Sequence, residues 1–360
     1  MVENKLRILA INPGSTSTKI GVYEEGSWLL ERTIRYEYAD LKDFANIVEQ
    51  KDMRKSFILE ALKEENIPLS SIKAIVGRGG IVKPVESGTY LVNDKLFHDL
   101  THGDGTRHAS SLGGIIGYEL GKELGIQAYI VDPVVVDEMI PIAKITGIKG
   151  IERRSIFHAL NSKFIARRLS EKLNKEYSHS RLIVAHLGGG ISVSAHLGGK
   201  VIDVNDAAAG EGPFSPERAG TLPSAGLIEL CFSGLYTKEE VYNLVMSQSG
   251  MLMHLGTKNL QEVEKRVQEG DEYGKLVVEA MAYQVSKQIG AMVAALEGEV
   301  EGIALTGGLA YSKTFTELVK RRVEKFAPVH IYPGEDELLA LVEGVLMVLN
   351  NKVKAKEYLG

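Results

Sequence analysis

The apolar and polar positions of this chain repeat one order of elements twice. Near the start, two apolar segments, residues 7–12 and 18–23, flank a turn rich in Gly, Ser and Thr, and residues 29–36 alternate between apolar and polar side chains. This pattern predicts three antiparallel strands. The same arrangement returns around a second glycine turn, in residues 182–186, 191–196 and 200–204. The repetition predicts a duplicated domain.

Helical spacing of apolar residues follows the first set of strands. It predicts helices over residues 40–50, 53–65 and 109–124, and single strands over residues 72–76 and 128–131. We expect Asp40 and Asp52 as N-caps and Gly125 as a C-cap, because these residue types satisfy the free backbone groups at helix ends.

The second half has the same alternation. A helix over residues 155–174, with Ser155 as its N-cap, precedes the three strands, and a polar loop over residues 205–223 follows them. The remaining expected elements are helices over residues 224–232, 238–247, 260–269, 272–296, 312–327 and 336–349, and strands over residues 303–305 and 329–332. Three strands followed by alternating helices and strands predict an α/β fold with a mixed sheet in each half, and not a simple Rossmann array.

The length of the chain supports two domains. With 360 residues it exceeds the size at which one hydrophobic core usually keeps growing. We expect an N-terminal domain of residues 1–140 plus 338–360 and a C-terminal domain of residues 141–337. Ordered crossovers near residues 132–150 and 334–337 are expected to join them.

Composition and charge bear on the class of function. The net charge of −5 offers no basic surface for nucleic acid, so we expect no nucleic-acid partner. No apolar run reaches the roughly 20 residues of a membrane span, and the first residues lead directly into a strand, without room for a signal peptide. The single cysteine, Cys231, excludes an intramolecular disulfide and a cysteine metal cluster. These features predict a cytoplasmic protein with no membrane partner.

The first glycine turn, residues 12–19, has the chemistry of an anion site. Its small residues let backbone N–H groups approach a phosphate, Ser15 and Ser17 add hydroxyl donors, and Lys19 adds a positive charge. It is not a Walker A loop, because that motif precedes a helix and here a strand follows. An ordinary hairpin with a Ser/Thr-rich turn is the alternative.

The second turn holds three consecutive glycines, Gly188, Gly189 and Gly190. A plain hairpin needs at most two residues that tolerate positive φ, so close approach of the backbone to a ligand explains this turn better than a slack loop does. His186 ends the preceding strand where Asn12 ends the first one. Two such turns half a chain apart predict a pair of loops that hold the phosphates of one nucleotide.

Two arginines and a histidine are further candidates. Arg78 follows a strand and lies between glycines, and Arg218 lies in a loop rich in Pro and Gly. Exposed surface charge is the simpler reading of both, but paired in this way they suit a clamp on phosphoryl and carboxylate oxygens. His158, near the start of a predicted helix, is either structural or a phosphate ligand.

Two later segments can also be interpreted either as structural turns or as ligand-binding sites. Gly307 and Gly308 join a strand to a helix, which is a common turn or a place where a nucleotide lies against backbone. Residues 335–337, Glu-Asp-Glu, precede or begin the last helix. Acidic residues there are favoured by the helix dipole alone, and carboxylates near a phosphate also suit Mg²⁺.

Taken in order, these segments resemble one known family. The segments are residues 11–19, Phe157-His158, residues 185–190, Arg218-Ala219-Gly220 and Thr306-Gly307-Gly308. Together they resemble the short-chain carboxylate kinases, which comprise acetate, propionate and butyrate kinases, of the actin, hexokinase and chaperone ATPase superfamily. The resemblance covers nearly the whole chain. It implies a duplicated βββαβαβα (ribonuclease H-like, actin-like ATPase) two-domain fold with an interdomain nucleotide cleft, carboxylate and phosphate on the N-terminal side and nucleotide on the C-terminal side.

Within this family the chain is most similar to the butyrate kinases. Acetate kinases have Asn where this chain has Gly189, a pocket valine where it has Gly80, and a pocket proline where it has Ala209. The last two differences remove bulk, and we expect them to leave room for a longer alkyl chain, with Phe157 as a third pocket residue. Each buried CH₂ group is worth about 0.8 kcal/mol, which is enough for a preference.

The resemblance also implies roles for single residues. Arg78 and Arg218 hold the carboxylate and the transferring phosphoryl group. His158 binds the equatorial oxygens of that group, and Asp132 organises water around Mg²⁺. The residues expected to bind nucleotide or phosphate are Asn12, Ser15, Ser17, Lys19, His186, Gly188, Gly189, Gly190, Gly307 and Gly308.

The expected cofactor is Mg²⁺, with ATP and ADP as co-substrates. Asn12 is one expected metal ligand. Asp336 is the best match to the metal carboxylate of the family, and Glu337 and Glu335 are close enough in sequence to compete with it. Family members are commonly oligomers, so the resemblance also implies a homo-oligomer.

The expected reaction is the reversible transfer of the γ-phosphoryl group of ATP to butyrate, giving butyryl phosphate and ADP. In the cell it is expected to run toward ATP in acid-forming fermentation. A carboxylate is already ionised at pH 7, so no general base is needed. Acetate, propionate or a branched short-chain acid is the nearest alternative substrate. A sugar kinase, which needs a base, and a nucleotide-gated binding protein without catalysis are the alternatives from other classes.

Overall fold

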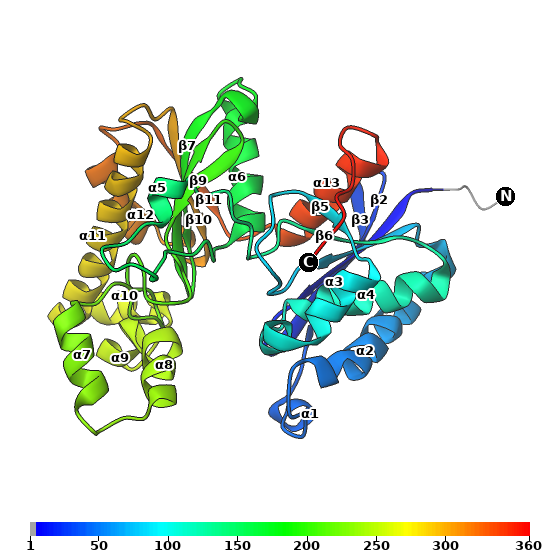
Figure 1. The fold of residues 1–360 in the computed structure, drawn as a ribbon, viewed down its shortest axis with the longest axis horizontal. Coiled ribbons are helices and arrows are strands. Elements are labelled where there is room, and N and C mark those ends of the chain that lie inside the picture. Colours follow the sequence, from blue (N-terminus) through cyan, green and yellow to red (C-terminus); the bar gives the residue numbers. More distant parts are fainter. Residues whose placement is uncertain (1–4) are drawn as a thin grey trace. The chain divides into compact units, whose positions relative to one another are not determined.

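The structure, a computed structural model, describes residues 5–360 and divides the chain into two units. The first unit holds the described residues up to Val136 together with Asp336–Gly360, and the second is Asp137–Glu335. Each unit has its own sheet (Figure 1). Each also has its own hydrophobic core. The chain thus leaves the first unit once and returns to it for its last helix.

The sheet of the first unit has the strand order β3-β2-β1-β4-β6-β5. The strands are β1 (Arg7–Pro13), β2 (Ser17–Glu24), β3 (Ser27–Arg35), β4 (Ala74–Arg78), β5 (Thr89–Leu91) and β6 (Ala128–Val131). β1 pairs antiparallel with β2, and β2 with β3, whereas β1, β4 and β6 run parallel. The parallel strands are almost entirely buried, as expected for strands covered on both faces.

Helices cover both faces of this sheet. They are α1 (Tyr38–Leu41), α2 (Lys51–Glu64), α3 (Asp94–Thr101), α4 (Ser111–Leu124) and α13 (Glu337–Leu349). Ile58 of α2 and Leu112 of α4 share a core cluster with Ile11 of β1. The next residue, Asn12, points to the opposite face, where it contacts Glu337 of α13.

The close packing of α4 on the sheet depends on two glycines. A Cβ atom at Gly77 of β4 would lie 2.1 Å from the backbone of Gly113 in α4. Because neither residue has a side chain, the helix backbone approaches the strand just before Arg78. Gly125 ends this helix with φ +65°, so the predicted left-handed C-cap is confirmed.

The second unit is built on a sheet with the order β11-β10-β7-β8-β9. Its strands are β7 (Arg181–Leu187), β8 (Ile191–Leu197), β9 (Lys200–Val204), β10 (Gly302–Gly307) and β11 (Val329–Pro333). Its helices are α5 (Pro141–Lys144), α6 (Ala159–Lys172), α7 (Ser224–Phe232), α8 (Lys238–Ser247), α9 (Gly250–Leu255), α10 (Leu260–Gln268), α11 (Glu272–Ala295) and α12 (Lys313–Val323).

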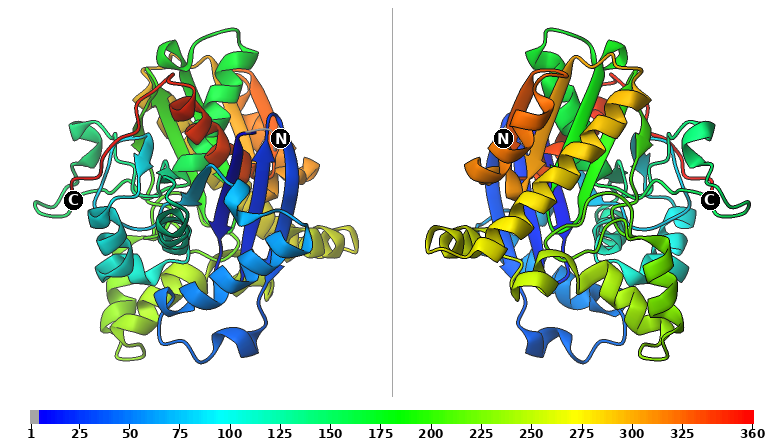
Figure 2. Two further views of the ribbon diagram at one scale, coloured as in Figure 1. Left: turned by 90° about the vertical axis from the view of Figure 1, so that its right-hand side faces the viewer. Right: turned by 90° about the vertical axis from the view of Figure 1, so that its left-hand side faces the viewer.

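Two layers of helices enclose this second sheet. The long helix α11 crosses one face (Figure 2, right), where Met281 and Val285 pack with Ile183 of β7. On the other face, Ser162 of α6 lies 2.7 Å from Ser194 of β8, oxygen to oxygen. The polar contacts on the α6 side and the apolar contacts on the α11 side give β8 a different surface on each face.

The two sheets repeat one topology. The order β3-β2-β1-β4-β6 in the first unit matches β9-β8-β7-β10-β11 in the second, with three antiparallel strands followed by two parallel ones in both. β5 is an addition to the first sheet. The predicted α/β fold with a duplicated βββαβαβα plan is therefore confirmed.

In each half of the chain, a helix that follows the last strand of one sheet packs against the other sheet. α6 follows the last strands of the first sheet in the chain but packs on β7 and β10. α13 follows β11 but packs on β1, β4 and β6. This exchange explains why Glu337, near the end of the chain, lies in the unit that also holds Asn12.

Several predicted boundaries are wrong. The expected helix over residues 40–50 is reduced to α1 and a short turn, Val48–Gln50. Asp40 lies inside α1 and accepts a hydrogen bond from the backbone N–H of Glu37, so it does not begin the helix. Gln50, and not Asp52, precedes α2. Helix α6 begins at Ala159 after His158, so Ser155 is not its cap. In each case a capping residue type is present, but chain geometry places the helix start elsewhere.

Four of the labelled elements were not predicted, namely β5, α3, α5 and α9. β5 and α9 are too short to show a period. α3 carried a usable signal, because the side chain of Asn93 caps it by accepting a hydrogen bond from the backbone N–H of Leu96. Among the described residues, no helix has the length and apolar character that a membrane span requires.

Candidate functional site

The first unit gathers polar residues where its parallel strands end. Asn12, Arg78 and Asp132 lie at or just beyond the carboxyl ends of β1, β4 and β6. Ligands of open α/β sheets bind beyond the carboxyl ends of the strands. The sheet therefore gathers these three predicted residues at one edge.

Glu337, the first residue of α13, joins two of them. Its Oε2 accepts hydrogen bonds from Asn12 Nδ2 at 2.6 Å and from Arg78 Nη1 at 2.7 Å. Its Oε1 is buried and has no hydrogen-bond partner among the described residues. A buried carboxylate oxygen without a donor is costly, so this oxygen is well placed to receive a ligand.

The acidic triplet splits in the structure. Glu337 is 5% exposed and faces Asn12, whereas Asp336 is exposed and makes no side-chain cap to α13. Glu335 lies in the second unit, where its Oε1 is 3.0 Å from Nε2 of His186. No cluster of three His, Cys, Asp or Glu side chains suited to a metal occurs in the described part of the chain. Asn12 and Glu337 are the candidate pair for a cation with oxygen ligands.

Asp132 anchors a neighbouring loop. Its Oδ1 accepts hydrogen bonds from Ser87 Oγ at 2.6 Å and from the backbone N–H of Gly88 at 2.8 Å. Its backbone has φ +39°, a conformation that few residues other than glycine adopt. Such strain persists where the surroundings enforce it and is common at functional sites.

The predicted phosphate loop is a tight turn between β1 and β2. The backbone N–H of Gly14 donates to the carbonyl of Ser17 at 2.7 Å. Gly14 and Ser15 are exposed, and Ser17 is partly buried. Lys19 extends from β2, but its Nζ lies 2.7 Å from Oε1 of Glu31 on β3. A phosphate contact by Lys19 stays a prediction, and it requires that this partly exposed ion pair open.

Arg54, which was not predicted as a site residue, binds the backbone carbonyls of this turn. The side chain is fully buried in α2. Nη1 donates to the carbonyls of Gly14 at 2.8 Å and Ser17 at 3.1 Å, and Nη2 donates to the carbonyl of Ser15 at 2.8 Å. Burial lowers the pKa of Arg54 by removing water from the charged form. With its carbonyls tied to one guanidinium, the turn is held in a single shape.

The second unit has a histidine pair at the corresponding edge. The rings of His158 and His186 stack with centroids 3.7 Å apart and planes 8° apart. His158 precedes α6 and lies 3.0 Å from Ser192 Oγ through Nδ1. His186, near the end of β7, is 1% exposed, and its Nδ1 lies 2.9 Å from Oδ1 of Asn161. Both ring nitrogens of His186 are thus engaged, and it positions His158.

The triple-glycine turn packs against the Arg218 loop. A Cβ atom at Gly190 would lie 2.0 Å from Nη1 of Arg218, and one at Gly189 would lie 3.0 Å from Oε1 of Glu217. A side chain at Gly188 would approach Nε2 of His186 to 3.0 Å. Glycine is therefore required at Gly190 for the placement of Arg218, a reason for this turn that is independent of any ligand.

Arg218 is held by backbone carbonyls and not by a carboxylate. Nη1 donates to the carbonyl of Ala207 at 2.7 Å, and Nε donates to the carbonyl of Met246 at 3.2 Å. Its Nη2 has no acceptor among the described residues. Burial lowers the pKa of Arg218, while the carboxylates of Glu217 and Asp206 oppose that shift. A guanidinium that is fixed through Nε and Nη1, with Nη2 available to donate, suits an anionic ligand.

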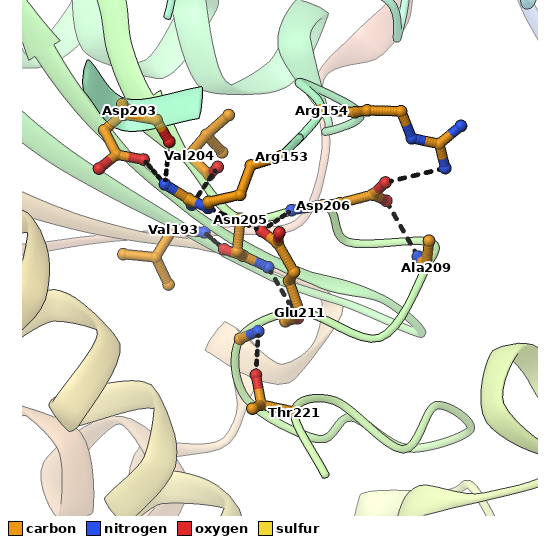
Figure 3. Close-up of polar contacts among 12 residues, drawn as sticks. Arg153, Arg154, Val193, Asp203, Val204, Asn205, Asp206, Ala209, Glu211 and Thr221 are labelled. Carbon is orange, nitrogen blue, oxygen red and sulfur yellow. Dashed lines mark hydrogen bonds and ion pairs between the residues drawn. The ribbon is translucent and has the colours of Figure 1, made fainter. Parts of the chain in front are cut away.

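A polar network fixes the loop that carries Ala209 (Figure 3). Oδ1 of Asp206 accepts from the backbone N–H of Ala209 at 2.9 Å, and its Oδ2 pairs with Arg154 at 3.3 Å. Arg153 pairs both with Asp203 of β9 and with Glu211 of this loop, and so links the strand to the loop. Because the backbone N–H of Ala207 also donates to the carbonyl of Ile156 at 2.9 Å, the loop is linked to the segment that holds Phe157 and His158.

The structure corrects one step of the argument about the acyl pocket. Gly80 was expected to leave room by lacking a side chain. A Cβ atom there would lie 1.8 Å from Oγ and 2.6 Å from Cα of Ser111. Helix α4 therefore fills the space, and the missing side chain of Gly80 gives no room to a ligand. Phe157 is 2% exposed. Ala209, in contrast, is exposed.

Gly307, the last residue of β10, and Gly308, which follows it, differ in whether the fold requires a glycine. Gly307 has φ +89°, and a Cβ atom on it would lie 2.5 Å from the carbonyl oxygen of Leu187. A Cβ atom at Gly308 meets nothing within 4 Å. Only Gly307 is thus required by the fold.

We expect Gly307→Ala to lower the free energy of unfolding, by roughly 2 kcal/mol or more, because the new methyl group both clashes and forbids the backbone angle. Gly308→Ala should leave stability within about 0.5 kcal/mol and raise KM for ATP several-fold, because its methyl group enters the predicted nucleotide site. Urea unfolding and initial rates measure the two effects. A KM for ATP unchanged by Gly308→Ala would remove Gly308 from that site.

Comparisons with known proteins agree on one family. The model of the acetokinase family matches residues 141–338, more than half of the chain. Acetate kinase from Porphyromonas gingivalis is similar in fold, with TM-score 0.79 and 20% identity over 96% of this chain and 100% of that one. A propionate kinase from Francisella tularensis has TM-score 0.74 and 18% identity, covering 94% of this chain and 98% of its own.

The wider likeness is to sugar kinases. A ROK hexokinase from Thermus thermophilus has TM-score 0.51 and 14% identity, covering 96% of this chain and 99% of its own. These structural likenesses concern the fold, and the family model carries the assignment. The chain belongs to the acetokinase family, the kinases that phosphorylate a carboxylate with ATP.

Proposed function

We propose that this protein is a butyrate kinase, which transfers the terminal phosphoryl group of ATP to butyrate and forms butyryl phosphate and ADP reversibly. Family membership supports carboxylate phosphorylation. The observation that favours butyrate over acetate is Ala209, an exposed small residue on the loop of Arg218 that borders an apolar pocket. In this proposal the protein acts in the cytoplasm as a homo-oligomer.

The chemical step needs charge neutralisation more than proton transfer. A carboxylate is ionised at pH 7 and attacks phosphorus without a base. In the proposal, Arg218 offers its free Nη2 to the transferring phosphoryl group, and His158, held by its stack on His186, donates to an equatorial oxygen. Preorganised donors of this kind stabilise the charge that develops in the transition state.

The first unit supplies groups for phosphate and metal. The turn from Asn12 to Lys19 binds phosphate oxygens, with Ser15 and Ser17 as hydroxyl donors. Mg²⁺ fits the pair Asn12 and Glu337, because Oε1 of Glu337 is buried without a partner and carboxylate oxygens suit this ion. Bound there, the ion would neutralise phosphate charge. Arg78 orients Glu337, and Asp132 keeps its predicted role toward the metal's water molecules.

The remaining roles in the proposal are those of nucleotide binding. Gly188, Gly189 and Gly190 present backbone to the nucleotide, and Gly307 and Gly308 form a second surface for it. His186, whose nitrogens contact Asn161 and Glu335, acts as a positioning residue for His158.

A panel of acids tests the proposal. Acetate, propionate, butyrate and isobutyrate are each incubated with ATP, Mg²⁺ and hydroxylamine, which traps acyl phosphates as hydroxamates. We expect kcat/KM to rise by about fourfold for each added methylene, so that butyrate exceeds acetate. A maximum at acetate would assign a different member of the family, and no hydroxamate from any acid would reject carboxylate kinase activity.

A further inference from the structure

An apolar pocket of about 430 Å³ lies in the second unit, between helices α7 and α8 and the loop of Arg218. Six apolar or weakly polar side chains account for most of its wall: Ala209, Leu227, Cys231, Val241, Val245 and Met246. None of the residues that line it is acidic, and its one charged residue is Lys238. An uncharged tail attached to an anion therefore fits its chemistry.

The pocket is continuous with the loop that holds the proposed catalytic arginine. The backbone N–H of Ala219 donates to the carbonyl of Val245 at 3.0 Å. Nε of Arg218 donates to the carbonyl of Met246 at 3.2 Å. Val245 and Met246 of α8 thus both line the pocket and accept hydrogen bonds from the Arg218 loop through their backbone carbonyls.

Ala209 sets the boundary between loop and pocket. Its backbone N–H donates to Oδ1 of Asp206 at 2.9 Å, which anchors the loop beside the pocket. The next residue, Gly210, has φ +88°, and a Cβ atom on it would lie 3.3 Å from Cγ1 of Val245. Because the side chain of Ala209 is small and Gly210 has none, α8 lies close to the loop and the pocket stays open beside it.

The size of the pocket exceeds what a short acid requires. Cavities of about 300 to 1,000 Å³ bury most of the surface of drug-sized ligands. The three-carbon tail of butyrate fills only a small part of such a volume. An unfilled apolar pocket beside a carboxylate site favours a longer apolar tail, since each buried methylene adds to binding.

We propose that this pocket receives the tail of carboxylates longer than butyrate, so that the protein phosphorylates medium-chain acids such as hexanoate. The proposal rests on the proposed carboxylate kinase activity and extends it to another substrate class. The carboxylate lies at Arg218, and the tail passes Ala209 to reach Val241 and Cys231.

A chain-length series is the first test. We expect kcat/KM to keep rising, by roughly fourfold for each methylene, from butyrate through pentanoate to hexanoate. Turnover of butyrate with no turnover of hexanoate would overturn the pocket proposal and leave the kinase assignment intact. No turnover of any acid would reject the kinase assignment itself.

A filled pocket is the second test. Val241→Phe adds bulk inside the pocket, and Asn243→Phe, two residues away on α8 and outside the pocket lining, is the matched control. We expect Val241→Phe to lower the ratio of kcat/KM for hexanoate to that for acetate by at least roughly tenfold. Asn243→Phe should leave both activities unchanged. An equal ratio in both variants would place the tail elsewhere.

Cys231 gives a readout that does not depend on activity. It is the one cysteine of the chain, it is exposed, and it lines the pocket. We expect hexanoate, but not acetate, to slow its alkylation by iodoacetamide in a dose-dependent way. Protection that depends on protein concentration and not on hexanoate would show that a second copy covers this face, and it would overturn the proposal.

Discussion

Replacing Arg218 with alanine should lower kcat for butyryl phosphate formation by roughly a thousandfold or more. Removing one preorganised donor from a transition state costs about 10² to 10³ in kcat, and an arginine that neutralises a transferring phosphoryl group is worth about 10³ to 10⁵. Arg218 is fixed on two carbonyls and keeps Nη2 free of protein acceptors among the described residues. Its loss therefore removes charge at the point of transfer.

The control for this variant concerns the loop. Arg218→Ala also leaves the carbonyls of Ala207 and Met246 without their donor, which is expected to cost about 1 to 2 kcal/mol of stability. Thermal unfolding measures that cost. Arg218→Lys keeps the charge but loses the two-carbonyl anchor, so we expect an intermediate kcat. A near-normal kcat for a folded Arg218→Ala protein would remove Arg218 from the transition state.

Replacing Arg54 with methionine should lower the free energy of unfolding by about 3 kcal/mol or more. The substitution keeps an unbranched aliphatic stem but removes the guanidinium, so the carbonyls of Gly14, Ser15 and Ser17 lose their shared donor. Because the turn is then free to change shape, KM for ATP should rise at least several-fold. Urea unfolding and steady-state rates measure the two effects.

A partly exposed arginine of the same unit, Arg32, supplies the control. Arg32 pairs with Glu64 and Glu65 at the surface, where ion pairs contribute at most about 1 kcal/mol. We expect Arg32→Met to change stability little and to leave KM for ATP unchanged. Arg54→Met with full stability and unaltered KM would contradict the role of Arg54 as the residue that positions the phosphate loop.

The duplicated sheets could be predicted from the sequence because each strand and turn is marked by residues that are close together in the chain. Apolar alternation on either side of Gly14 and of Gly188 marks each hairpin, and the periodic helices that follow are long enough to show a helical pattern. Helix boundaries were harder to predict where a polar side chain could either cap a helix or hydrogen bond elsewhere. Asp40 resembles an N-cap, but in the structure its side chain serves the backbone N–H of Glu37. Short elements such as β5 give no period at all.

The site was predictable only where a residue type itself suggests chemistry. Arg78 and Arg218 stood out by their glycine neighbours, and the acidic triplet by its charge. The choice of Glu337 as the partner of Asn12 depends on where α13 docks, a contact between positions at opposite ends of the chain. Arg54 looks like an ordinary helix residue in the sequence.

Gly80 and Ala209 show the limit of reading pocket size from side-chain volume. Both are smaller than the residues expected in acetate kinases. The space beside Gly80 is filled by Ser111, whereas Ala209 borders a real pocket. Which small residue leaves a cavity depends on the element packed against it, and a single sequence does not contain that information.

The reverse reaction tests the central claim most directly. The purified protein is given ADP and Mg²⁺ with either butyryl phosphate or acetyl phosphate, and ATP formation is followed by luciferase. We predict ATP from both, with kcat/KM for butyryl phosphate higher by about fifteenfold for its two additional methylenes. ATP from neither acyl phosphate, or a preference for acetyl phosphate, would contradict the account.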